Sequence, residues 1–156
     1  MGNCIKRNRN VIKAFKQEQT IEEMTTNAVH FVVPISEGWC ISVYDGDTIT
    51  IATNLNINGT TTLYKFNVRI RGIDCPEMRS KNNVEKQYAI KAKELVQNLC
   101  YGKCVKLANV SYDKYGRILA DVYCDDILIA QRLLNSKLAV EYNGKQKTFV
   151  NWNYMQ

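Results

Sequence analysis

Hydrophobic and polar residues alternate along the middle of the chain in a way that is typical of strands. The β-branched runs WCISVY (39–44) and TITIAT (48–53) flank an Asp-Gly-Asp turn, and together they predict a β-hairpin. We expect the segment NLNINGTT (54–61) to form the turn that follows. Two strands and two turns are therefore predicted between residues 39 and 61.

A third strand is predicted over LYKFNVRIRGI (63–73), where polarity alternates with a period of two residues. One face of this strand would be apolar and pack on the core, and the other would carry two arginines. The apolar face comprises Tyr64, Phe66, Val68 and Ile70, and the polar face comprises Lys65, Asn67, Arg69 and Arg71.

Apolar residues at helical spacing between 83 and 100 predict an amphipathic helix that ends near Gly102. Two further strands are predicted at 104–110 and 118–124, and a second helix at about 127–137. Five strands, with one helix after the third and one after the fifth, favour a small closed β-barrel with two packed helices, an α+β fold. The expected apolar stripe of the second helix is Ile127, Ala130, Leu134 and Leu138.

The N-terminal residues differ from the rest of the chain in charge. The 156 residues carry a net charge of +6, but residues 1–16 hold five Lys and Arg side chains and no acid, which leaves +1 for the rest. Net charge therefore does not mark the barrel region as a nucleic-acid binder. We interpret residues 1–33 as a basic, partly helical arm and residues 34–150 as one globular domain.

Cysteine and histidine usage limits the kinds of site that the chain can form. Six cysteines are present without a preceding signal-peptide segment, so we expect reduced thiols in a cytoplasmic protein rather than a secreted disulfide scaffold. One histidine and no C-x-x-C pair argue against a structural zinc site. No apolar stretch reaches the length of a transmembrane helix.

Charged residues gather where the predicted strands end or turn. Each cluster alone is more often structural than functional, because Asp-Gly-Asp is a common turn and Pro76 can simply end a strand. Together, however, they combine carboxylates, which need a cation of the Ca²⁺ or Mg²⁺ kind, with arginines, which bind phosphate bidentately. Such a set favours metal-assisted phosphodiester hydrolysis. The clusters are Asp45 with Asp47, Arg69 with Arg71, Asp74 with Glu77, and Asp113 with Arg117.

Five sequence blocks, in this order and spacing, resemble the staphylococcal-nuclease-like (thermonuclease) family over about residues 38–143. Their joint occurrence is far more specific than any one block. The resemblance implies a five-stranded OB-type barrel with helices, and a Ca²⁺-dependent nuclease that cleaves single-stranded DNA and RNA and leaves 3′-phosphates. The blocks are YDGDTITI, VRIRGIDCPE, VEKQYAIKAKELV, DKYGRILADVY and IAQRLLNSKLAVEY.

The resemblance also implies a metal site and a general base. Asp47 and Asp74 would bind Ca²⁺ through their carboxylates. Cys75 would contribute its main-chain carbonyl, at a position where the family often has threonine or alanine. Glu77 would deprotonate or orient the attacking water, and Asp45 would shape the turn without binding the metal directly.

Substrate contacts follow from the same resemblance. Arg69 and Arg117 would hold the scissile phosphate, and Tyr115 and Tyr142 would lie along the nucleotide. Arg71 shares a strand face with Arg69, and two readings of it stay open, a further phosphate contact and a surface ion pair.

The first residues, MGNCIKRNRN, suggest membrane attachment. Gly2 follows Met1 as in a myristoylation signal, and Cys4 is a candidate for palmitoylation, although Lys6 replaces the usual Ser or Thr. Acylation together with basic residues would anchor the protein to a membrane. The alternative is a basic tail that raises nonspecific nucleic-acid affinity.

Three functions are compatible with these patterns. A monomeric metal-dependent nuclease accounts for the complete set of acids and arginines. A noncatalytic module of the same fold would bind nucleic acid or protein and use the acids structurally. A membrane-tethered structural protein would act through its N-terminal arm.

Overall fold

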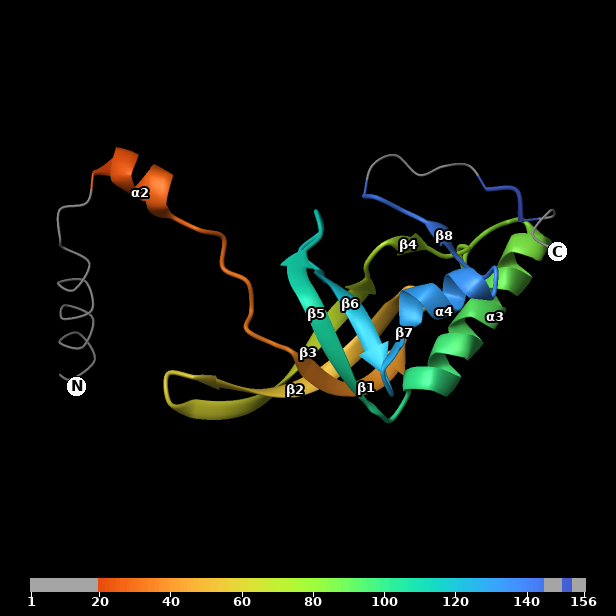
Figure 1. Ribbon diagram of the computed structural model, residues 1–156, viewed down its shortest axis with the longest axis horizontal. Coiled ribbons are helices and arrows are strands. Elements are labelled where there is room, and N and C mark those ends of the chain that lie inside the picture. Colours follow the sequence, from red (N-terminus) through yellow and green to blue (C-terminus); the bar gives the residue numbers. More distant parts are fainter. Residues whose placement is uncertain (1–19, 145–149, 153–156) are drawn as a thin grey trace, which may run out of the picture. The chain divides into compact units, whose positions relative to one another are not determined.

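The computed structural model describes residues 20–144 and 150–152 of the chain. These residues belong to two compact units, Met1–Phe31 and Val32–Gln156. The second unit contains the barrel, with strands β1 to β8 in Figure 1. In the described ranges, no helix combines the length and the apolar character that a membrane span requires.

The described part of the first unit is a short helix, α2 (Ile21–Asn27), with an extended segment after it. The helix begins with a capping box. The Thr20 hydroxyl accepts a hydrogen bond from the main-chain N–H of Glu23 at 3.1 Å, and the Glu23 carboxylate accepts one from the N–H of Thr20 at 2.9 Å. All seven helical residues are exposed, so local capping rather than burial favours this helix.

Five strands of the second unit close into a β-barrel (Figure 1). The order is β3-β2-β1-β5-β6 with antiparallel neighbours, and a parallel pairing of β3 with β6 closes the barrel. This arrangement confirms the predicted five-stranded OB-type barrel. The strands are β1 (Glu37–Val43), β2 (Thr48–Ile57), β3 (Thr60–Ile70), β5 (Cys104–Tyr112) and β6 (Ile118–Cys124).

Two helices, α3 (Asn83–Cys100) and α4 (Ile129–Asn135), lie side by side against one end of the barrel (Figure 1). The Asn82 side chain caps α3 by accepting hydrogen bonds from the N–H groups of Val84 and Glu85 at 2.9 and 3.3 Å. The bounds of α3 confirm the helix predicted at 83–100.

The core fills the barrel and continues beneath the helices. A two-stranded sheet of β4 (Ile73–Asp74) and β8 (Val140–Glu141) lies beside it. Trp152 is buried, and its ring centroid lies 5.8 Å from that of Tyr88 on α3, so the C-terminal segment packs on the same helix. The largest fully buried side chains include Ile49, Ile51, Val68, Ile70, Ile73, Val96, Ile129 and Leu133.

The turn predicted within residues 54–61 is present but shorter than expected, because most of that segment is strand. β2 continues to Ile57 and β3 starts at Thr60, and these two residues are cross-strand partners. Only Asn58 and Gly59 form the turn, with φ angles of 53° and 80°. An Asn-Gly pair adopts these left-handed angles at low cost, which allows the ladder to continue to the tip of a long hairpin.

The second helix begins later than the predicted residue 127. Asp125 and Asp126 have φ angles of 49° and 62° and turn the chain back on itself. Ile127 and Leu128 then form strand β7 (Ile127–Leu128), which pairs with β6. The predicted apolar stripe is wrong in part for the same reason. Ile127 is exposed, whereas Ile129 and Leu133, outside the predicted stripe, are buried together with Ala130.

Candidate active site

The loop between β1 and β2 carries Asp45 and Asp47 in a tight turn. Asp45 accepts a hydrogen bond from the N–H of Asp47 at 3.1 Å, and the N–H of Tyr44 donates to the carbonyl of Thr48 at 2.9 Å. Asp45 therefore holds the turn. Asp47 is buried, and its carboxylate accepts hydrogen bonds from the Thr48 hydroxyl and the main-chain N–H of Cys75 at 3.1 and 2.9 Å.

Gly46, between the two aspartates, is in very close contact with helix α3 and the segment after β4. A Cβ atom at this position would lie 2.7 Å from both the Cβ of Ala92 and the Sγ of Cys75. Contacts below 3.0 Å require the neighbours to move. The absence of a side chain at Gly46 thus lets the acidic loop reach the chain that carries Asp74.

Replacing Gly46 by alanine is expected to lower the free energy of unfolding by about 1–3 kcal/mol, because the added methyl group overpacks this contact. Urea denaturation followed by circular dichroism measures the change. Ser42→Ala, an exposed substitution in β1, is the control and should stay near the native value. Native stability of the Gly46→Ala protein would show that the contact is loose.

Arg69, near the end of β3, bridges two aspartates from separate segments. Its Nη1 lies 3.0 Å from Oδ2 of Asp47, and its Nη2 lies 3.1 Å from Oδ1 of Asp74. The arginine is 9% exposed. Because one planar guanidinium contacts both carboxylates, the two acids lie close enough to face the same cation.

The same two carboxylates fit a divalent cation chemically. Burial raises the pKa of Asp47 to about 6, with Arg69 acting against this shift and Asp45 reinforcing it. A buried carboxylate with a raised pKa is incompletely compensated when ionised, so additional positive charge stabilises it. Carboxylate oxygens are the ligands that Ca²⁺ and Mg²⁺ prefer. In the described ranges, no group of three or more His, Cys, Asp or Glu side chains is arranged to hold a metal ion.

Cys75 follows Asp74 directly, and Glu77 lies two residues further along the chain. The Cys75 side chain is buried, and burial, reinforced by the charge of Asp47, raises the pKa of its thiol. The sulfur therefore stays protonated, and the carbonyl is the group of Cys75 suited to a hard cation. Glu77 is exposed, and its N–H donates to Glu85 at 3.2 Å, which ties this segment to the first turn of α3.

The turn between β5 and β6 positions Arg117 and Tyr115. Asp113 accepts hydrogen bonds from the N–H groups of Tyr115 and Arg117 and from Nε of Arg117, at 2.8, 2.9 and 2.7 Å. Burial alone would raise the pKa of Asp113, but these bonds hold the pKa below its ordinary value. The guanidinium carbon of Arg117 lies 5.6 Å from the centre of the Tyr115 ring, within cation–π range.

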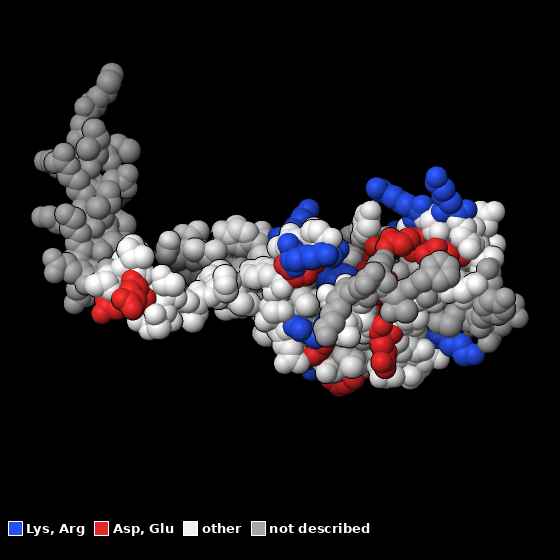
Figure 2. Space-filling view, turned by 90° about the horizontal axis from the view of Figure 1, so that it is seen from above, with Lys and Arg blue, Asp and Glu red and all other residues white. Residues whose placement is uncertain are grey.

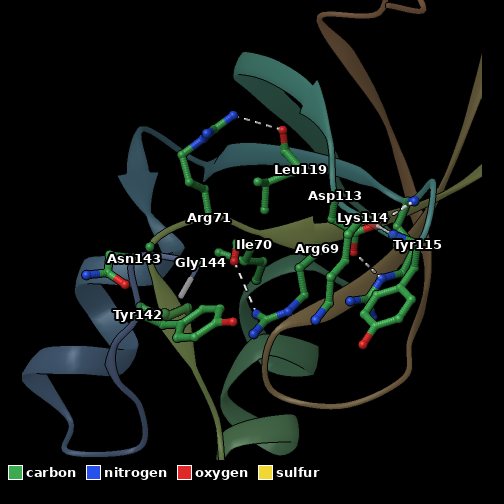
Figure 3. Close-up of a pocket in the computed structure, with 13 residues that line it drawn as sticks. Arg69, Ile70, Arg71, Asp113, Lys114, Tyr115, Leu119, Tyr142, Asn143 and Gly144 are labelled. Carbon is green, nitrogen blue, oxygen red and sulfur yellow. Dashed lines mark hydrogen bonds and ion pairs between the residues drawn. The ribbon is translucent and has the colours of Figure 1, made fainter. Parts of the chain in front are cut away.

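These residues line two adjoining depressions. The first, called the acidic hollow, has a volume of about 530 Å³ and is lined by all eight site residues predicted from the sequence. The second, called the side cavity, has a volume of about 490 Å³. The residues that line both depressions are Arg69, Lys114, Tyr115, Arg117 and Tyr142. Figure 3 shows Arg69 between the Tyr142 and Tyr115 side chains. The acidic hollow is lined by Tyr44, Asp45, Asp47, Arg69, Asp74, Cys75, Pro76, Glu77, Lys114, Tyr115, Arg117 and Tyr142.

Arg71 points away from Arg69, toward Leu119, although both lie on the same face of the chain (Figure 3). Its guanidinium donates to the carbonyls of Asn109 and Leu119 and lies 3.6 Å from Asp121. Of the two readings left open, the ion pair is the one observed. Arg71 thus ties β3 to the irregular part of β5 and to β6.

The structure adds two residues to the predicted set, Tyr44 and Lys114, which both line the acidic hollow. The position of Tyr44 directly before the D-G-D block and that of Lys114 within the D-K-Y-G-R block were the available signal. On the face of the second unit in Figure 2, acidic side chains lie between two groups of Lys and Arg side chains. Gly2 and Cys4 lie outside the described residues, so acylation and membrane attachment stay predictions.

Comparison with known proteins places this site in a family. The sequence model of the family described as "Staphylococcal nuclease homologue" matches residues 67–154, more than half of the chain. This range includes Arg69, Asp74, Glu77 and Arg117 and begins after the loop that carries Asp47.

Individual relatives are similar over about half of the chain. A probable staphylococcal-like nuclease of Oryza sativa subsp. japonica is 33% identical over 80 residues, which are 51% of this chain and 22% of that protein. A probable endonuclease of Schizosaccharomyces pombe is 33% identical over 91 residues, 54% of this chain and 40% of that protein. The match with a staphylococcal-like nuclease of Arabidopsis thaliana is 32% over 83 residues, covering 53% and 24%.

The chain spans less than half the length of each of these relatives. The closed five-stranded barrel, the acids and arginines gathered in one hollow, and a family match over more than half of the chain lead to the same assignment. This chain belongs to the staphylococcal nuclease homologue family.

Proposed function

We propose that this chain is a metal-dependent nuclease that hydrolyses phosphodiester bonds in single-stranded DNA and RNA and leaves 3′-phosphate ends. The observation that supports this most is a single guanidinium, that of Arg69, between Asp47 and Asp74 in a hollow that Glu77 and Arg117 also line. The relatives named nucleases or endonucleases agree with the proposal.

The arginines bind the phosphate and oppose the charge that it gains. Asp113 fixes the Arg117 side chain through Nε, which leaves the terminal nitrogens oriented as donors from the β5–β6 turn. Arg69 approaches from β3, because the parallel β3–β6 pairing brings the two chain segments together. Guanidinium groups match phosphate oxygens in geometry, and donors that are already oriented stabilise the additional charge of the transition state.

Glu77 receives a proton from the attacking water. As the water oxygen forms its bond to phosphorus, the carboxylate accepts the proton and the bond from phosphorus to the 5′-oxygen breaks. A solvent proton completes the 5′-hydroxyl, and the phosphate stays on the 3′-oxygen. An exposed carboxylate at the rim of the hollow is well placed to exchange that proton with water.

Ca²⁺ is the proposed metal. Asp47, Asp74 and the main-chain carbonyl of Cys75 would hold it, and as a bound cation it would offset the charge on the reacting phosphate. The chain's own part in this is to supply hard oxygen ligands and arginines in the same hollow, with Arg69 in contact with both aspartates.

Chelation tests the proposal. Purified protein with single-stranded DNA and Ca²⁺ should produce fragments with 3′-phosphate ends, and excess chelator should abolish cleavage until Ca²⁺ is restored in excess. Fragment ends are assigned by mass spectrometry. Cleavage that survives chelation contradicts the metal requirement, whereas no cleavage under any condition supports the noncatalytic binding module. Mg²⁺ in place of Ca²⁺ shows which of the two ions the site uses.

A further inference from the structure

Tyr44 is an aromatic residue on the wall of the acidic hollow that packing does not require. It follows β1 directly, and Val43 before it is buried in the core. Because successive side chains of an extended chain point to opposite sides, Tyr44 is directed away from the core. Its side chain is 58% exposed. Tyr101 is exposed to the same extent, so what distinguishes Tyr44 is that its exposed ring lines the acidic hollow.

The main chain of Tyr44 is held firmly. Its N–H donates to the carbonyl of Thr48 at 2.9 Å, across the turn that Asp45 stabilises. Gly46 fixes the same turn against α3 and Cys75 through its close contacts. Because its main chain is already fixed, Tyr44 has only two side-chain torsions to order when it contacts a ligand, which keeps the entropic cost of that contact small.

Tyr44 also has a distinct place relative to the other aromatic residues. Tyr115 and Tyr142 line both the acidic hollow and the side cavity, and so do Arg69 and Arg117. Tyr44 lines the hollow but not the side cavity. Within the hollow it therefore belongs with the acids and Glu77, on the part of the wall that the side cavity does not share.

A nucleic-acid strand with its scissile phosphate at the two arginines must extend in both directions from that phosphate. One neighbouring nucleoside can enter the side cavity, between Tyr115 and Tyr142. The nucleoside on the opposite side of the phosphate then passes the part of the hollow where Tyr44 is exposed. Stacking of a base on an aromatic ring contributes roughly 1–3 kcal/mol and tolerates any base, since every base has a π face.

We propose that Tyr44 forms a second nucleobase-stacking subsite, for the base across the scissile phosphate from the side cavity. The inference rests on the proposed function for the position of that phosphate. Its ligand is an unpaired base of any identity, because only a base that has left a duplex can present its face to the ring. Tyr44 would thus contribute to a preference for single strands without reading sequence.

Dinucleotides test the subsite, because a single phosphodiester bond fixes the register. The substrates carry two bases, or one base and an abasic sugar on either side of the phosphate. Tyr44→Ala should lower kcat/KM for the two-base substrate by about 5- to 150-fold, the equivalent of one stacked base. One of the abasic substrates should show no further loss in this variant, as a double-mutant cycle requires. Tyr44→Phe keeps the ring and should retain the native kcat/KM.

Tyr101 provides a matched control. It has the same exposed fraction, 58%, but it caps the far end of α3 and lines neither depression. Tyr101→Ala should leave every substrate unaffected. Equal effects of Tyr44→Ala on all three dinucleotides would overturn the subsite, since the loss would then not depend on a base.

A binding measurement separates this inference from the nuclease proposal. The same dinucleotides are titrated in chelator and followed by NMR, where no cleavage is needed. If the native protein never cleaves but Tyr44→Ala still weakens binding only when the base on one side is present, the subsite stands and the nuclease proposal fails. If the protein cleaves and Tyr44→Ala binds and cleaves like the native protein, the nuclease proposal stands and the subsite fails.

Discussion

Replacing Arg69 by glutamine should lower the free energy of unfolding by about 3–5 kcal/mol, because it leaves the buried carboxylate of Asp47 and the partly buried carboxylate of Asp74 without their shared counter-charge. The same substitution should reduce kcat by about 10²- to 10³-fold, because a preoriented donor to the phosphate is lost. Chemical denaturation in chelator measures the first effect, and cleavage of single-stranded DNA at saturating Ca²⁺ measures the second.

Arg132→Gln makes the same change in charge at an exposed position in α4, and it should alter neither quantity appreciably. A divalent cation at the two carboxylates would stabilise the Arg69→Gln protein by mass action. Ca²⁺ should therefore raise its unfolding free energy more than that of the native protein, in which the guanidinium already faces both acids. A stable, fully active Arg69→Gln protein would contradict both roles.

Glu77→Gln should reduce kcat by about 10²- to 10⁴-fold and leave stability nearly unchanged. The amide is similar in size but cannot accept the proton of the attacking water, and general acid–base catalysis contributes about this factor. The position is exposed, so little packing is disturbed. Single-turnover cleavage with the Ca²⁺ concentration varied separates the chemical step from metal binding.

Glu94→Gln, at an exposed position on α3 outside both depressions, serves as the matched control. If Glu77 acts as the base, kcat should fall while the concentration of Ca²⁺ needed for half-maximal rate stays the same. If instead the concentration requirement rises and kcat recovers at high Ca²⁺, Glu77 serves the metal and another group accepts the proton.

Local patterns were sufficient to predict the barrel, whereas the roles of the site residues came from the family resemblance and stay predictions. The helical spacing in 83–100 and the second half of the alternation in 63–73 each describe a structure whose one face is buried. The alternation does not record burial throughout, because Tyr64 of its apolar face is exposed and Arg69 of its polar face is buried. The acids and arginines lie at strand ends and turns, next to these patterns. Closing the barrel then brings β3 and β6 together, and with them Arg69 and the turn that carries Arg117.

Features that depend on contacts between distant segments could not be predicted in the same way. The β2–β3 ladder continues to an Asn58–Gly59 turn because this pair accepts left-handed angles, and the polar residues around it resemble a loop. The bridge from Arg69 to Asp47 and Asp74, and the contact of Gly46 with Ala92, depend on side chains or atoms that sequence spacing does not bring together. Tyr44 belongs to an apolar strand run and reads as core until its exposure is known.

The guanidinium between the two aspartates has a consequence for the binding of the proposed metal ion. Without Arg69 the two carboxylates would repel each other, although the contacts of Gly46 and the hydrogen bond from Cys75 would still hold the loop between β1 and β2. Because the Arg69 guanidinium already contacts both carboxylates, Asp47 and Asp74 are close together before any ion binds. Little ordering entropy would therefore be lost when the ion binds. Binding of the proposed ion would then require no change in the architecture of the barrel.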